Sequence, residues 1–116
     1  MIIKYKFRYD FITRASAEFA HRINQSLKIG YIKWESSKVT VPSRFIFTFI
    51  TSESKVHFKF LEIRLFNKHL EVSFGQEETK VFDTSDEVVS YLTNLRVSEK
   101  LAKRLDTYSL FEIHEL

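Results

Sequence analysis

Apolar and polar residues alternate strictly near the start of the chain. The apolar positions are Ile3, Tyr5, Phe7 and Tyr9, and the polar positions between and after them are Lys4, Lys6, Arg8 and Asp10. A period of two is typical of a β-strand that buries one face and exposes the other. We therefore expect a strand over residues 3–10 with a solvated, mostly basic face.

The spacing of the apolar residues changes from Thr13 onward. One side of a helix would carry Ala15, Phe19, Ala20, Ile23 and Leu27. Thr13 or Ser16 can cap the start of such a helix, and Gly30 suits the left-handed position just past its end. The spacing thus predicts a helix between Thr13 and Gly30.

Strand patterns fill the middle of the chain. Short strands are expected at 31–34 and 38–41, followed by a strand at 44–50 that is apolar on both faces, as a central strand covered on each side would be. Another strand is expected over 55–66, where the alternation changes phase. A β-bulge near Phe60–Leu61 would reconcile the two phases.

Residues 61–74 predict a hairpin with a defined register. With Asn67-Lys68 as a two-residue turn, the apolar pairs on one face are Leu65 with Leu70, Ile63 with Val72, and Leu61 with Phe74. The same register places Arg64 opposite Glu71 on the other face. The hydrophobic pattern and the charge pair agree, so we expect this pairing.

The last third of the chain predicts a short strand at 79–82 and two helices. Thr84 and Glu87 have the spacing of a capping box, and Ser98 can cap the second helix. The tail over 108–113 fits either a final strand or a docked extension.

These elements predict a single α+β domain over residues 1–116. We expect a mostly antiparallel β-sheet of about five or six strands, with one helix after the first strand and two short helices near the C-terminus. A chain of 116 residues leaves no room for a second core.

Composition excludes several kinds of site. The chain has no Cys, which rules out disulfides and thiolate ligands and fits a cytoplasmic location. No apolar run approaches the roughly 20 residues of a membrane span. No nucleophile elbow is present, and His57 and His69 would lie on the order of 30 Å apart along the predicted ladder. We therefore expect no cofactor, metal or catalytic residue, although a dispersed active site is a third hypothesis.

The charge is divided unevenly along the chain. Residues 1–59 carry 11 Lys and Arg against 4 acids, and residues 60–116 carry 7 against 11, so the halves are +7 and −4 and sum to +3. The candidate basic surface consists of Lys4, Lys6, Arg8, Arg14, Arg22, Lys28, Tyr31, Lys33, Lys38 and Arg44. Such a surface can bind a polyanion. Equally, Lys and Arg on an edge strand can serve to block aggregation.

Two functions follow from this charge pattern. The first is a small non-enzymatic protein-interaction module, such as an inhibitor, adaptor or regulatory subunit of the kind that phages and mobile elements use, with a protein partner or a second copy of itself. An exposed apolar patch near Leu110, Phe111 and Ile113 would favour it. The alternative is a nucleic-acid-binding module that uses the Lys4–Arg8 face and the first helix.

Overall fold

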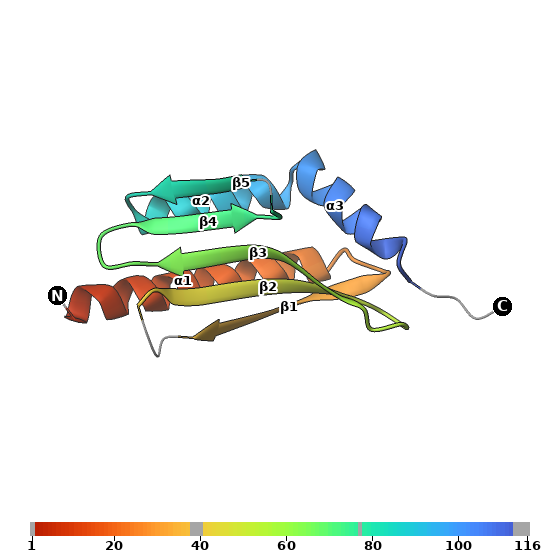
Figure 1. The fold of residues 1–116 in the computed structure, drawn as a ribbon, viewed down its shortest axis with the longest axis horizontal. Coiled ribbons are helices and arrows are strands. Elements are labelled where there is room, and N and C mark those ends of the chain that lie inside the picture. Colours follow the sequence, from red (N-terminus) through yellow and green to blue (C-terminus); the bar gives the residue numbers. More distant parts are fainter. Residues whose placement is uncertain (1, 38–40, 77, 113–116) are drawn as a thin grey trace.

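A computed structural model describes residues 2–37, 41–76 and 78–112 of the chain. Within these ranges the chain forms three helices and five strands (Figure 1). In chain order they are α1 (Ile2–Asn24), β1 (Gly30–Ser37), β2 (Ser43–Thr51), β3 (His57–Leu65), β4 (Leu70–Phe74), β5 (Glu78–Phe82), α2 (Ser85–Arg96) and α3 (Glu99–Ser109).

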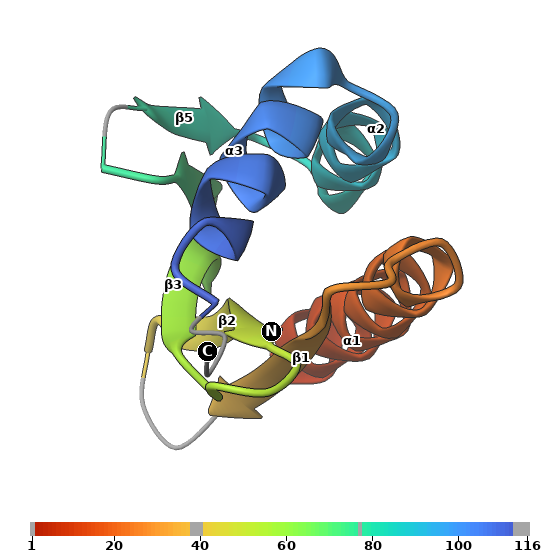
Figure 2. The same ribbon diagram turned by 90° about the vertical axis from the view of Figure 1, so that its right-hand side faces the viewer.

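The five strands form one antiparallel sheet in which sequence neighbours are also spatial neighbours, in the order β1-β2-β3-β4-β5. All three helices lie on the same face of this sheet (Figure 2). One core lies between the two layers, and Phe45, Phe47 and Phe49 of β2 are completely buried in it. The predicted α+β class is therefore confirmed, with one helix before the strands and two after them.

The strand predicted at residues 3–10 is wrong, because these residues form the first turns of α1. Tyr9 and Ile12 are buried, whereas Phe7, which a strand would place on the same face as Tyr9, is 66% exposed. The buried positions continue through Phe19 and Ile23 at helical spacing. The helix prevails because it adds Tyr9 and Ile12 to the apolar stripe that packs on the sheet.

The expected role of Gly30 is also wrong. Helix α1 ends at Asn24, and Gly30 begins β1 without a positive φ. A Cβ at Gly30 would lie 2.4 Å from the Cζ atom of Phe49, so the absence of a side chain makes room for this ring. The Asn24 side chain donates to the carbonyl of Ile32 and accepts from its N–H, which joins the end of α1 to β1.

The strand expected at 31–34 is confirmed as part of β1, which continues through Ser37. Most of the expected strand at 38–41 lies outside the described residues. The central position of β2 is confirmed. Its expected cover on both faces is not found, since the described helices all lie on one side (Figure 2).

The predictions for the β3–β4 hairpin are confirmed. Leu65 pairs with Leu70 and Arg64 pairs with Glu71, as the pattern required. The β2–β3 register shifts between Phe47, which pairs with Leu61, and Thr48, which pairs with Lys59, so the bulge lies at the expected place.

The two C-terminal helices begin at the predicted caps. Thr84 and Glu87 form both hydrogen bonds of a capping box, and the Ser98 hydroxyl accepts from the N–H of Leu101. Helix α3 continues into the tail, and the Glu112 carboxylate accepts hydrogen bonds from the N–H groups of Glu53 and Ser54. The described part of the tail is therefore a docked extension.

Substitution of Tyr9 and Phe7 separates a helix from a strand at the N-terminus. Because Tyr9 is buried and Phe7 is exposed, we expect Tyr9→Ala to lower the free energy of unfolding by roughly 3–5 kcal/mol. Phe7→Ala should change it by less than about 0.5 kcal/mol. Urea unfolding followed by circular dichroism measures both, and similar losses for the two variants would contradict the helix.

Candidate functional site

The structure distributes the predicted basic residues over separate surfaces. They lie on α1 (Arg8, Arg14, Arg22), in the connection after it (Lys28), on β1 (Tyr31, Lys33) and on β2 (Arg44). The side chains of Lys4 and Lys6, and all of Lys38, lie outside what the structure describes. Among the placed residues, Arg8 is half-buried and donates to the carbonyl of Asn67 at 2.9 Å, so it ties α1 to the β3–β4 turn.

A network of ion pairs occupies the sheet face opposite the helices. Glu62 lies at its centre and is only 4% exposed, although no described helix covers this face. Its carboxylate pairs with Arg64 at 3.2 Å, with Arg44 at 3.4 Å and with Lys59. Burial acts to raise the pKa of the Glu62 carboxyl, but hydrogen bonds and attraction from Lys59 and Arg64 outweigh it and lower this pKa overall.

Arg64 extends the network across β4. Its guanidinium also pairs with Glu71 at 3.2 Å and donates to the hydroxyl of Ser73 at 2.7 Å. The cationic groups of Arg44 and Arg64 are thus engaged by carboxylates within the sheet. A phosphate on this face would have to compete with Glu62 and Glu71, so the outer face is a poor surface for a polyanion.

Tyr31 and Lys33 project from the outer face of β1, opposite the buried Ile32, and Tyr31 is 40% exposed. The Lys55 ammonium lies 5.3 Å from the centre of the Tyr31 ring. One face of this ring is therefore already occupied by a cation.

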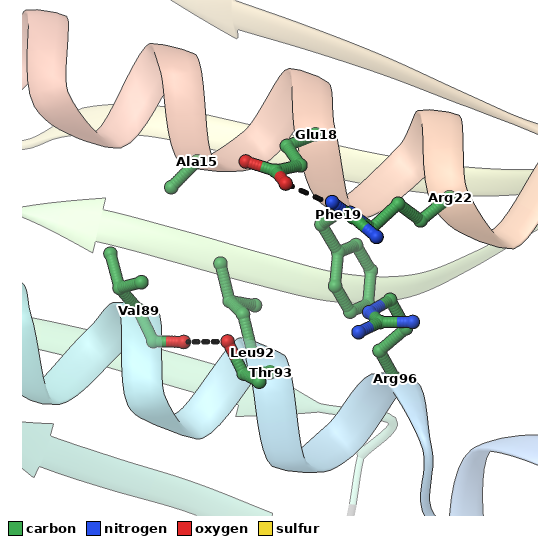
Figure 3. A pocket seen from close by; sticks show the side chains of 8 residues that line it. All are labelled: Ala15, Glu18, Phe19, Arg22, Val89, Leu92, Thr93 and Arg96. Carbon is green, nitrogen blue, oxygen red and sulfur yellow. Dashed lines mark hydrogen bonds and ion pairs between the residues drawn. The ribbon is translucent and has the colours of Figure 1, made fainter.

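A groove lies between α1 and α2 (Figure 3). We call it the α1–α2 groove; its volume is about 280 Å³ and its lining consists of Ala15, Glu18, Phe19, Arg22, Val89, Leu92, Thr93 and Arg96. Arg22 is a predicted site residue, and its Nε–H group donates to Glu18 at 2.8 Å. Arg96 was missed by the sequence analysis. Arg96 lies four residues after Leu92, so it is on the same side of α2 as the apolar residues. This spacing could have predicted that Arg96 lies near the contact with α1.

A third surface lies where α3 meets the β2–β3 end of the sheet. We call it the aromatic end, defined by Phe49, Phe58, Tyr108, Leu110 and Phe111. The Tyr108 ring stacks on Phe58 with centres 4.4 Å apart, and Phe58 contacts Phe111 at 5.3 Å. Leu110 is 83% exposed and Phe111 is 56% exposed. The expected apolar patch is thus present at Leu110 and Phe111, whereas Ile113 lies outside the described residues.

Within residues 2–37, 41–76 and 78–112, no group of His, Asp or Glu residues has the arrangement of a metal site. The same part of the chain contains no helix that is both long and apolar enough to span a membrane.

The network around Glu62 predicts a pH-dependent contribution to stability. Glu62→Gln should lower the free energy of unfolding at neutral pH by roughly 1–3 kcal/mol, because Arg44, Lys59 and Arg64 lose a shared anion. Since the folded-state pKa is lowered, this contribution is present above about pH 4.5 and is lost as the pH falls through the folded-state value. Urea unfolding at neutral and acidic pH should therefore show a difference from wild type that shrinks on acidification. Glu35→Gln, an exposed substitution on the same face, is the control, and a difference independent of pH would contradict this role of Glu62.

Comparisons with protein-family models, with curated proteins and with solved structures find no match to this chain. Function is therefore inferred from the three surfaces of the molecule: the outer face of the sheet, the α1–α2 groove and the aromatic end. Of these, the outer face of the sheet pairs Arg44, Lys59 and Arg64 with its own carboxylates. The aromatic end and the α1–α2 groove present groups that the described fold leaves open to a partner.

Proposed function

We propose that the protein is a small protein-interaction module that binds a partner protein, or a second copy of itself, through the aromatic end. The observation that carries this proposal is the exposure of Leu110 and Phe111 beside a stack of aromatic rings. Exposed apolar side chains that form a contiguous patch mark sites of interaction with other proteins.

The packing behind these side chains supports the proposal. The rings of Tyr108 and Phe58 are nearly parallel, with an angle of 6° between them, and Tyr108 also stacks on Phe49, whose side chain is completely buried. The patch is therefore attached to the core. Residues that dominate binding energy at protein interfaces are commonly aromatic and held in such packed surroundings.

Hydrogen bonds to the neighbouring turn also support it. Glu112 follows Phe111 in the chain, and its carboxylate accepts hydrogen bonds from the N–H groups of Glu53 and Ser54. These bonds tie the segment after α3 to the β2–β3 turn. A surface ordered before binding loses less conformational entropy on association, which favours affinity.

The nucleic-acid alternative has less support. Its predicted residues lie on different faces, and Arg8 and Arg44 are engaged within the fold. Binding by the exposed arginines of α1 stays a prediction, and an oligonucleotide titration is included in the experiment on the α1–α2 groove below.

Leu110→Asp tests the proposed contact surface. Because Leu110 is 83% exposed, the variant should unfold at the wild-type temperature, yet it should weaken association by about tenfold or more. Sedimentation velocity measures self-association, and quantitative affinity capture measures partners. Val97→Asp is the matched control, since Val97 is 72% exposed and lies at the α2–α3 junction. If Leu110→Asp retains the oligomeric state and every captured protein of the wild type, the aromatic end is not the interface.

A further inference from the structure

We infer that the α1–α2 groove is a second binding site, which accepts an apolar side chain flanked by carboxylates in an acidic peptide segment of a partner protein. This inference is independent of the aromatic end, because none of the residues that line the groove belongs to that surface. It rests on the shape of the groove, on the character of its floor and on the charges at its rim.

The floor of the groove is apolar, and two of the side chains that form it are short. Ala15 and Val89 are half-buried and lie on facing helices, above Phe19 and Leu92, which are each 3% exposed. Short side chains at a helix–helix contact leave space that larger ones would fill. The volume of about 280 Å³ is slightly below the roughly 300–1,000 Å³ of pockets that enclose small-molecule ligands. The space therefore suits a single aliphatic side chain better than a cofactor.

The rim of the groove carries positive charge from both helices. Figure 3 shows Arg22 on α1 and Arg96 on α2 at the same end of the groove, beside the ring of Phe19. Glu18 engages the Nε–H group of Arg22. The terminal amino groups of Arg22, and the whole Arg96 guanidinium, have no hydrogen-bond or ion-pair partner among residues 2–37, 41–76 and 78–112.

The orientation of Arg96 is informative. An arginine in the last turn of a helix is stabilised by the helix dipole when it stays near the terminal carbonyl groups. Figure 3 instead shows the Arg96 side chain directed toward α1, and Arg96 is half-buried. Glu18 pairs with the Nε–H group of Arg22 alone, so a carboxylate from a partner would find the Arg96 guanidinium and the terminal amino groups of Arg22 open to pairing.

The same features argue against a nucleic acid as the occupant. Bases stack on exposed aromatic faces in single-strand binding sites, but Phe19, the aromatic residue of the groove, is 3% exposed and offers no such face. A peptide with a leucine between glutamates satisfies both the apolar floor and the arginines. Charge complementarity and the size of the floor thus favour an acidic, apolar-anchored peptide.

An NMR titration of the isotopically labelled protein tests this site. The probe is a short peptide with one leucine flanked by glutamates, and the comparison peptides replace either the leucine by serine or the glutamates by lysine. We expect the probe alone to shift the amide signals of Ala15, Phe19, Val89 and Thr93. A single-stranded oligonucleotide is titrated in parallel.

Three variants make the result specific. Arg96→Gln should weaken binding of the probe about tenfold through loss of a charge-assisted hydrogen bond. Ala15→Leu should fill the floor and abolish binding while keeping a good helix former in α1. Arg14→Gln is the charge-matched control on the exposed side of α1, outside the groove, and should leave the affinity within about twofold.

Several outcomes would overturn the inference. Absence of shifts with the probe peptide at millimolar concentration would do so, as would an equal loss for Arg14→Gln and Arg96→Gln, which indicates unspecific attraction. If the oligonucleotide shifts the amide signals of the groove and the peptide does not, the groove binds a nucleic acid and the proposed peptide is wrong. Failure of this site would leave the Leu110 experiment unaffected, because the two experiments perturb different surfaces.

Discussion

The packing of α1 on the phenylalanine residues of β2 is the contact on which the rest of the structure depends. Phe19 meets Phe47 edge-on with ring centres 5.4 Å apart, and Tyr9 contacts Phe45 at 5.0 Å. Each such ring buries on the order of 150–250 Å². Without α1 the inner face of β2, an interior strand of the sheet, would be exposed to water. The long N-terminal helix therefore decides which face of the sheet is the core.

This one-sided cover explains the other two surfaces of the sheet layer. No described helix covers the outer face, so its own side chains shield the strands from water. Glu62 is buried there by Arg44, Lys59 and Arg64, whose long aliphatic parts lie over the strands. Toward the other end of β2, Tyr108 of α3 stacks on Phe49. The exposed side chains of Leu110 and Phe111 follow directly from that second contact. The proposed partner surface thus adjoins the place where α3 takes over from α1 in covering β2.

Some parts of this arrangement were readable in the sequence because they depend on neighbouring residues. The β3–β4 register needed only the alternation on both strands and the Arg64–Glu71 pair. The capping box needed only Thr84 and Glu87. The strand prediction for residues 3–10 was wrong, because strict alternation and a helical stripe coexist there. Tyr5, Tyr9 and Ile12 are spaced by four and three positions, which continues the pattern of the helix that follows. A search for this spacing would have favoured the helix.

By itself, the sequence determined the fold class, most of the strands, the bulge, the hairpin register and the caps of the last two helices, since each depends on local hydrogen bonds or on a local apolar period. Only the tertiary structure decided that α1 begins at the N-terminus, because burial of Tyr9 and Ile12 requires the sheet to be present. The tertiary structure also decided which charged side chains lie close to one another. Arg44 is engaged by Glu62 from the adjacent strand. Arg22 and Arg96 come from two helices that are far apart in the chain, and both line the α1–α2 groove. Such juxtapositions depend on how layers pack, which the period of a single segment does not encode.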